Sequence, residues 1–327
     1  MPTFDPDEIQ FALESTRQAV QLVELIQKEL VGGALTKDDR SPVTVADFAA
    51  QAWIGYCLAQ AYPADGLVAE EDSARLKSDP AMLEQVTQYI QRQIGSASAE
   101  SVASWIDHNR VDGGERFWTL DPIDGTQGFL RGDQYAVALA LVVEGQVVLG
   151  VLGCPHLNPH AQPVQNSGAL FYAARDYGAW AVDLQPNHIP MRLETSTLTE
   201  PIEARILRSY ESGHTNTGKI DDFARLMNTQ AEQVLMDSQA KYAVLASGGA
   251  DILLRLLSAH QPNYHEKIWD QAAGSIVLEE AGGKISDLDG KPLDFTTGRS
   301  LTNNRGILAS NRNLHPAALD ALRQVGA

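Results

Sequence analysis

The chain has 327 residues, of which 44% are hydrophobic and 20% charged, and its formal net charge is −17. This composition predicts an ordinary globular protein, long enough for one large layered domain or two lobes. The acidic balance argues against a nucleic-acid polymer as a partner, because phosphate backbones are bound by clusters of Lys and Arg. It leaves a small anionic substrate open, since bound metal ions can reverse the sign of the field inside one cleft.

The cellular location is predicted from what the sequence lacks. The stretch Met1–Asp7 has no basic or apolar signal region, and no later run approaches the length needed to span a membrane. The only two cysteines, Cys57 and Cys154, cannot supply a secreted disulfide framework and suit a reducing compartment. We therefore expect a cytoplasmic protein without a membrane partner, either a monomer or a homodimer.

The first part of the chain is predicted to combine helices with strands and hairpins. Apolar residues at helical spacing predict one helix over about 7–30 and a second over about 44–61. A short buried strand over 67–69 then leads to Glu70, and two hairpins follow, the first over 135–153 and the second over 169–182.

The second part of the chain is also predicted to interleave helices with strands. We expect a strand over 204–207, a helix over 220–227, an apolar stretch over 242–257, and a helix between Trp269 and Gly282. Polar loops are expected over 155–167 and 185–201. The interleaving predicts an α/β or α+β layered sandwich with mixed sheets, divided into lobes 1–185 and 186–327.

The most informative segment is the run from Asp121 to Leu130, which sets Asp121 and Asp124 three positions apart before Gly125. Mg²⁺ prefers oxygen ligands and is held by one or two carboxylates shared with substrate phosphates. Gly125 lets the backbone approach a ligand, and a helix starting near Thr126 would present free N–H groups to an anion. The pattern therefore indicates a phosphoryl-transfer site, although the run alone could be a tight connection between a strand and a helix.

Three further acids stand at predicted strand ends or helix starts. Asp47 follows Thr44 at the spacing of a capping box, so it could be only a helix cap. Glu70 ends an apolar strand but could lie in a solvated loop, and Asp270 could cap the helix that it opens. If all these ends converge, the carboxylates repel one another strongly, and two or more Mg²⁺ ions would resolve that conflict.

Several motifs resemble those of the inositol monophosphatase superfamily of lithium-sensitive, magnesium-dependent phosphatases. They are Asp121-Pro-Ile-Asp124-Gly-Thr126, Glu70-Glu71-Asp72 and Trp269-Asp270-Gln-Ala-Ala-Gly274. A narrower resemblance, to the 3′(2′),5′-bisphosphate nucleotidases, rests on four runs: Ser41–Asp47, Gly128–Asp133, Gly150–Pro155 and Asp237–Tyr242. Gln127 departs from the resemblance, which leads us to expect Lys at this position.

The resemblance implies specific roles for these residues. Glu70, Asp121 and the Ile123 carbonyl would hold one Mg²⁺ ion, and Asp121, Asp124 and Asp270 a second. Asp47 would help to place a third ion or a water, and with the Thr126 hydroxyl would accept the proton of the attacking water. Most metal ligands would thus lie in the first lobe.

The resemblance also implies a substrate with two phosphates. His214, Ser238, Lys241 and Arg255, in the second lobe, would hold the nucleotide and its non-reacting phosphate, while Gly125 and Thr126 would contact the reacting one. The expected reaction removes the 3′-phosphate of adenosine 3′,5′-bisphosphate to give AMP, and the 3′-phosphoadenylyl sulfate donor is a further candidate. Inositol 1,4-bisphosphate and inositol monophosphate are the alternatives.

Short motifs in the chain also match two other classes of protein, a serine acyl-transfer enzyme and a calcium-binding module. Ser238-x-x-Lys241 matches the nucleophile motif of serine acyl-transfer enzymes, but the Ser-Asp-Asn and Lys-Thr-Gly runs that complete their site do not occur. Asp287-x-Asp289-Gly290 resembles the start of a calcium loop, yet the later ligands of an EF-hand are missing. We expect that segment to be a turn before a strand.

Overall fold

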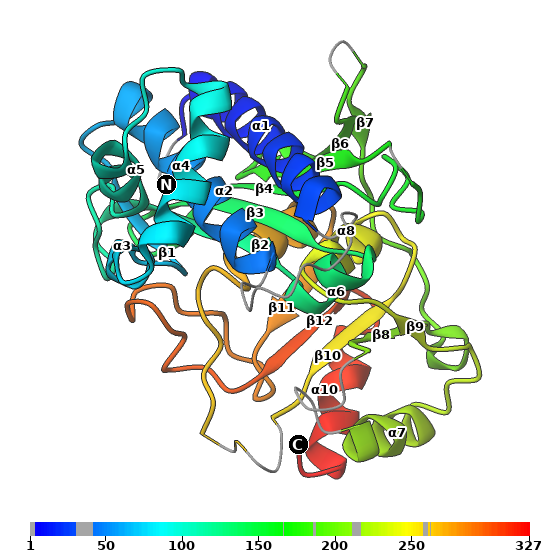
Figure 1. Cartoon of the computed structure of the whole chain (residues 1–327). Helices are drawn as coiled ribbons and strands as arrows, with labels where there is room; N and C mark the ends of the chain where they lie inside the picture. The colour runs from blue at the N-terminus through cyan, green and yellow to red at the C-terminus, as the bar shows by residue number, and fades with distance from the viewer. Residues whose placement is uncertain are drawn as a thin grey trace.

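The computed structural model describes residues 4–30, 42–165, 167–185, 188–210, 217–257, 261 and 263–327. These residues form two β-sheets with helices between and around them (Figure 1). The first sheet has seven strands that lie side by side in chain order. They are β1 (Gly66–Ala69), β2 (Arg116–Asp124), β3 (Ala136–Val143), β4 (Gln146–Cys154), β5 (Ala169–Ala174), β6 (Gly178–Asp183) and β7 (Met191–Arg192).

The second sheet has five strands in the order β11-β12-β10-β8-β9. Their bounds are β8 (Ile206–Arg208), β9 (Val234–Leu235), β10 (Ile252–Arg255), β11 (Gly283–Ser286) and β12 (Ile307–Asn311). Both sheets are mixed: β1 and β2 pair in parallel within an otherwise antiparallel sheet, and β10 pairs in parallel with β8 but antiparallel with β12.

The helices form layers on both faces of the sheets. They are α1 (Pro6–Leu30), α2 (Pro42–Ala61), α3 (Ser73–Lys77), α4 (Pro80–Gln93), α5 (Ala99–Ile106), α6 (Thr126–Arg131), α7 (Thr217–Leu226), α8 (Ala240–Ala246), α9 (Ala272–Glu280) and α10 (His315–Gln324), with a 3₁₀ turn η1 (Pro201–Glu203). None of the described helices is both long enough and apolar enough to cross a lipid bilayer.

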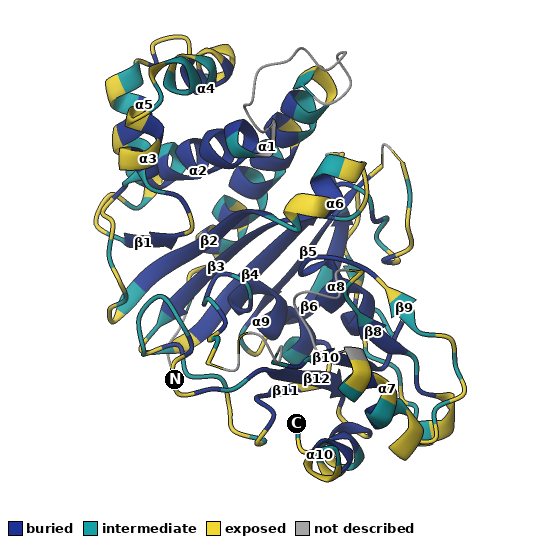
Figure 2. Ribbon diagram, turned by 60° about the horizontal axis from the view of Figure 1, so that its bottom comes forward, coloured by how far each residue is buried: buried dark blue, intermediate teal, exposed yellow. Residues whose placement is uncertain are grey.

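Buried apolar side chains determine how these layers stack. Helices α1 and α2 pack on one face of the first sheet, α8 and α9 lie between the two sheets, and α7 and α10 cover the outer face of the second (Figure 2). Strands β3 and β4 are therefore buried on both faces, which explains their almost continuous apolar sequences. The fold class is the predicted layered sandwich with mixed sheets.

Several boundaries differ from those predicted. The apolar stretch 242–257 divides at Gly248-Gly249 into helix α8 and strand β10, and the strand expected over 204–207 is β8, at 206–208. The segment at Asp287 forms a turn after β11 instead of before a strand, with the Asp287 carboxylate accepting from two backbone N–H groups. The sequence reasoning did not predict α3 to α5, strand β2, or the final elements β11, β12 and α10.

The predicted boundary between lobes, at residue 185, falls between the sheets only approximately, because β7 at Met191–Arg192 still pairs with β6. Helix α9 belongs to the second half in sequence, yet it packs against β4 and β5 of the first sheet. The division into two lobes remains a proposal.

Candidate active site

The end of strand β2 is bent at the residues that the sequence singled out. Regular pairing with β3 stops at Asp121 and resumes at Asp124, because Pro122 has no N–H to donate and the Asp121 carboxylate accepts from the Ile123 N–H at 3.1 Å. Gly125 follows with a φ of 95° in the left-handed region, and α6 starts at Thr126. A Cβ on Gly125 would lie 2.8 Å from the Cβ of Ser238, so this position requires glycine.

Glu70 reaches the same place from strand β1. The parallel register sets Ala69 beside Leu120, so the next residues, Glu70 and Asp121, leave their strands side by side. The carboxyl groups of Glu70 and Asp121 lie within hydrogen-bonding reach of each other. Burial, followed by repulsion from Glu71 and Asp124, raises the pKa of Glu70 to about 7.

Asp47 lies within helix α2, which begins at Pro42, so its interpretation as a helix cap is wrong. Its side chain is buried, and one carboxylate oxygen has no hydrogen-bond partner among the described residues. Burial, with repulsion from Glu70 and Glu71, raises the pKa of Asp47 well above its ordinary value. A buried carboxylate without a partner is costly, which indicates a group that meets a ligand.

Asp270 lies in the turn before α9, whose N-cap is Gln271, so Asp270 does not cap this helix either. Its pKa is raised well above the ordinary value by burial and then by repulsion from Asp124. Asp121 shows the same behaviour, with burial as the first cause and repulsion from Asp124, Glu70, Asp270 and Asp47 as the others. The five predicted carboxylates therefore act on one another electrostatically.

A cavity of about 400 Å³ connects most of the predicted site residues. Those that line it are Glu70, Asp121, Ile123, Asp124, Gly125, Thr126, Ser238, Lys241, Arg255 and Asp270. Asp47 is not among the lining residues. Within the described parts of the chain, no three His, Cys, Asp or Glu side chains stand ready to hold a metal ion as they are arranged.

The cationic part of the cavity comes from helix α8 and strand β10. Lys241 is buried and donates to the Ser209 hydroxyl at 2.8 Å, not to Ser238, which further disfavours the acyl-transfer reading. Burial, with repulsion from Arg255, lowers the pKa of Lys241 to about 8. Arg255 forms an ion pair of 2.7 Å with the buried carboxylate of Glu266. His214 lies outside the described residues.

Gln239 is a lining residue whose importance the sequence reasoning missed. Its backbone N–H donates to the Asp124 carboxylate at 2.6 Å. Its side-chain amide donates to the Trp269 carbonyl at 2.8 Å and accepts from the Gly274 N–H at 3.0 Å. Gln239 therefore connects Asp124 to the segment that carries Asp270. Its position beside Ser238 in a quoted motif was the only available signal, and that signal does not reveal these contacts.

The chain is similar to known proteins over nearly its whole length. The sequence model of the inositol monophosphatase family matches residues 5–327. A 3′(2′),5′-bisphosphate nucleotidase of Schizosaccharomyces pombe is 39% identical over 346 residues, covering 99% of this chain and 96% of the relative. An Oryza sativa protein of the same name is 41% identical over 338 residues, covering 97% of this chain and 93% of the relative.

Solved structures share the fold at lower sequence identity. An inositol monophosphatase from Zymomonas mobilis aligns with a TM-score of 0.67 and 22% identity, covering 98% of this chain and 100% of that one. An IMPase from Thermotoga maritima aligns with a TM-score of 0.64 and 21% identity, covering 98% of both chains. The chain belongs to the inositol monophosphatase family.

Proposed function

We propose that this chain is a Mg²⁺-dependent phosphomonoesterase that removes the 3′-phosphate of adenosine 3′,5′-bisphosphate to give AMP. The observation that carries this proposal is a cavity in which carboxylates from the end of β1, from β2 and from the turn before α9 share one space with Lys241 and Arg255. A substrate with two phosphates needs both a site for cations and separate cationic side chains. Relatives named 3′(2′),5′-bisphosphate nucleotidase support the same activity.

The chemistry of the donors fits hard divalent cations. All the candidate side-chain ligands are carboxylates, which Mg²⁺ prefers. Their pKa values are raised first by burial and then by repulsion from one another, and a bound cation would offset both effects. The unpartnered oxygen of Asp47 adds to this fit. When bound, such ions lower the pKa of a coordinated water and stabilise charge on the leaving oxygen.

The side chains divide the binding of metal ions, the transfer of the proton and the contact with the phosphate among them. Glu70, Asp121 and the Ile123 carbonyl would hold one ion, and Asp121, Asp124 and Asp270 would hold a second. Asp47 would support a third ion or a water. The Thr126 hydroxyl would take the proton of the attacking water while passing its own proton to the Asp47 carboxylate, which would be the final acceptor. Gly125 and the first N–H groups of α6 face the reacting phosphate.

The cationic side chains hold the second phosphate. Lys241 provides a point charge. Arg255 uses its Nε atom to pair with Glu266 and would offer the other N–H groups of its planar guanidinium to the phosphate. Ser238 contributes its hydroxyl, and His214 belongs to the same clamp. The 3′-phosphoadenylyl sulfate donor fits the same groups. The second candidate is an inositol bisphosphate, since it also carries two phosphates, whereas inositol monophosphate would leave the clamp unused.

A substrate panel tests this proposal. Phosphate release is measured with Mg²⁺ for adenosine 3′,5′-bisphosphate, inositol 1,4-bisphosphate, inositol monophosphate and fructose 1,6-bisphosphate, with AMP as a control that lacks the reacting phosphate. We expect the highest kcat/KM for adenosine 3′,5′-bisphosphate, AMP as its product, and no release from AMP. Preference for an inositol substrate would replace the nucleotide assignment, and no release from any member would contradict a phosphatase.

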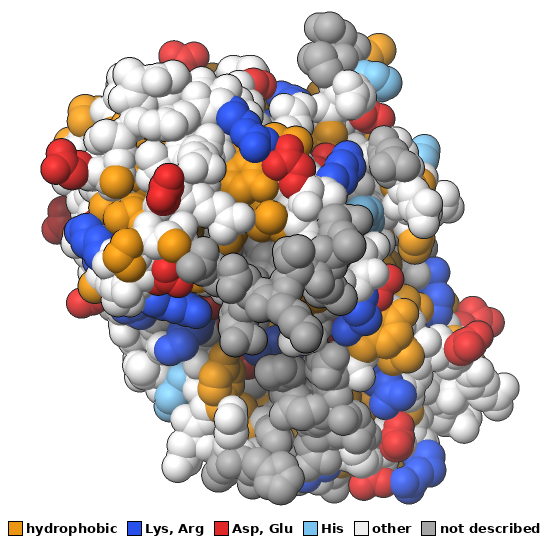
Figure 3. Space-filling model, in the orientation of Figure 1, with side chains coloured by type: hydrophobic (Ala, Val, Ile, Leu, Met, Phe, Trp, Pro, Cys, Tyr) orange, Lys and Arg blue, Asp and Glu red, His pale blue; other side chains and the backbone are white. Residues whose placement is uncertain are grey.

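The partners follow from the same chemistry. We expect a small bisphosphate to be the only ligand besides metal ions. We expect the protein itself to be a monomer or a homodimer. On the face drawn in Figure 3, Lys and Arg side chains lie among Asp, Glu and uncharged groups, an arrangement unlike the basic stripe of a nucleic-acid binder. Cys57 and Cys154 are both free thiols, which fits the reducing environment of the cytoplasm.

A further inference from the structure

Arg299 lies in the loop between β11 and β12, outside the motifs of the site and outside the residues that line the cavity. We infer that Arg299 is a positioning residue that fixes the Glu70 segment against the Asp270 segment and so sets the spacing of the metal ligands. This inference rests on the proposed metal-dependent function. It concerns two stretches of chain that are far apart in sequence, one at the end of strand β1 and one in the turn before helix α9.

The backbone around Arg299 is attached to the Asp270 segment. The Ile268 N–H donates to the Arg299 carbonyl at 3.2 Å, and the Leu301 N–H donates to the Glu266 carbonyl at 2.9 Å. Between them, Lys267 and Ser300 form an isolated antiparallel bridge. Arg299 therefore moves with the residues that lead directly to Asp270.

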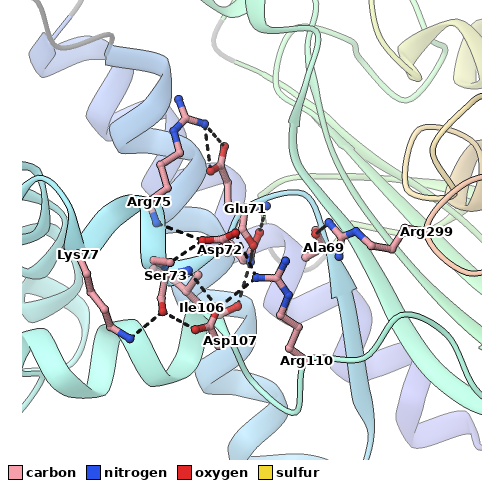
Figure 4. Close-up of polar contacts among 12 residues, drawn as sticks. Ala69, Glu71, Asp72, Ser73, Arg75, Lys77, Ile106, Asp107, Arg110 and Arg299 are labelled. Carbon is pink, nitrogen blue, oxygen red and sulfur yellow. Dashed lines mark hydrogen bonds and ion pairs between the residues drawn. The ribbon is translucent and has the colours of Figure 1, made fainter. Parts of the chain in front are cut away.

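The side chain of Arg299 reaches from there to the other sheet. One guanidinium nitrogen donates to the carbonyl of Ala69, the last residue of β1, at 2.7 Å, and Glu70 is the next residue (Figure 4). The guanidinium also stacks on Trp269, with 4.7 Å between its carbon and the ring centroid. A single planar group thus contacts the residue before Glu70 and the residue before Asp270.

The Glu70 segment is held on its other side by Gln51 from helix α2. The Gln51 side chain donates to the Glu71 carbonyl at 2.8 Å and accepts from the Glu71 N–H at 3.0 Å. Glu70 is therefore fixed by its two neighbours, Ala69 through Arg299 and Glu71 through Gln51. Of these two clamps, only Arg299 joins the first sheet to the Asp270 segment.

A charged guanidinium at position 299 is not needed merely to fill the space beside Trp269. Its second terminal nitrogen is buried and has no hydrogen-bond partner among the described residues. An apolar side chain could cover Trp269 without burying an unpaired donor. A guanidinium can stack on a ring and donate in its own plane at once, whereas the ammonium of Lys is a point charge that cannot do both. Groups behind metal ligands commonly tune metal affinity in this way.

The test compares Arg299→Gln and Arg299→Lys with wild type. Mg²⁺ dissociation constants are measured by calorimetry, and phosphate release is followed against Mg²⁺ concentration to separate the half-saturating metal concentration from kcat. We expect both variants to bind Mg²⁺ about tenfold more weakly, with kcat at saturating Mg²⁺ changed by less than about threefold. If Arg299→Gln does not fold, Arg299→Lys carries the test.

Arg305→Gln is the matched control. Arg305 also donates to a backbone carbonyl at 2.7 Å, that of Ala327, but it contacts no segment that carries a candidate ligand. We expect its variant to keep the wild-type Mg²⁺ dissociation constant. An unchanged constant in folded Arg299 variants, or an equal change in Arg305→Gln, would overturn the inference. A wild-type protein that binds no Mg²⁺ would overturn the proposed function together with the inference, and the two failures are thereby distinguished.

Discussion

Lys241 combines a charge that the proposed substrate needs with a pKa close to physiological pH. Burial and the neighbouring Arg255 lower this pKa to about 8, while Asp124, Asp237 and Glu266 act in the opposite direction. The side chain is therefore charged below about pH 8 and loses its proton above it. A phosphate held by this ammonium group is released as the charge disappears.

This titration predicts how substrate binding changes with pH. We expect the KM for adenosine 3′,5′-bisphosphate, measured at saturating Mg²⁺, to rise between about pH 7 and about pH 9. Lys241→Arg should remove this rise, because a guanidinium stays charged over this whole pH range. Lys241→Met, which has no charge at any pH, should raise KM roughly tenfold or more at both about pH 7 and about pH 9. A rise that persists unchanged in Lys241→Arg would show that another group is responsible.

At the scale of elements, the position of Asp270 depends on how closely α9 approaches β4. A Cβ on Gly150 of β4 would lie 2.9 Å from the Ala273 Cα atom and 2.6 Å from the Ile276 side chain. Only a glycine allows the helix to lie this close to the strand. The helix that follows Asp270 is thereby seated against the sheet that carries Asp121 and Asp124.

We therefore expect Gly150→Ala to lower the free energy of unfolding by about 1–3 kcal/mol, since the helix must move away or the strand must bend. Gly95→Ala is the control, because a Cβ there meets no atom within 4 Å. Denaturant unfolding of both variants measures the difference. Equal stabilities of the two variants would contradict the close packing of α9 on β4.

The elements that the sequence predicted well are those with strong local signals. The helices α1 and α2 and the two hairpins β3-β4 and β5-β6 have long apolar patterns bounded by glycine or turn residues. Strand β12, by contrast, has only three apolar residues, Ile307 to Ala309, before Ser310 and Asn311, and periodicity alone cannot separate so short an apolar run from part of a buried helix. Helices α3 and α5 have only five and eight residues, too few for a long periodic face. Helix α4 has 14 residues and buries Val86, Tyr89 and Ile90 on one face, a local signal that the sequence analysis did not use.

The site was predictable to a similar extent and for similar reasons. Carboxylates at strand ends and a glycine before α6 leave a local signature in the sequence. The Arg255–Glu266 ion pair and the bridging role of Gln239 depend on which segments meet in space, which single-chain patterns do not encode. The capping interpretation of Asp47 was wrong because α2 starts earlier than its Thr44 signal indicated.

At the scale of the whole molecule, mutual repulsion among the carboxylates links folding to pH and to metal ions. The pKa of Glu70 is raised to about 7, so this group favours the folded state most below its unfolded pKa. That contribution is lost as pH rises through about 7, when the folded protein must accept another buried negative charge. A bound cation would replace the lost proton.

We therefore expect saturating Mg²⁺ to raise the melting temperature more at about pH 8 than at about pH 6. Scanning calorimetry with Mg²⁺ and with chelator measures the two differences. Glu70→Gln should reduce the dependence on pH, since it removes the titrating group. A Mg²⁺ effect of equal size at both pH values would show that proton release from the cluster is not coupled to metal binding.

Acidic side chains from the ends of β1 and β2 and from the turn before α9 are proposed to act together with Mg²⁺ on a phosphate ester. The most direct test measures phosphate release from adenosine 3′,5′-bisphosphate by wild type and by Asp124→Asn, each with Mg²⁺ and with chelator. We predict that chelation abolishes wild-type release and that Asp124→Asn lowers kcat by roughly a hundredfold or more, because a cation loses a charged ligand. Wild-type release that survives both chelation and the substitution would contradict the account.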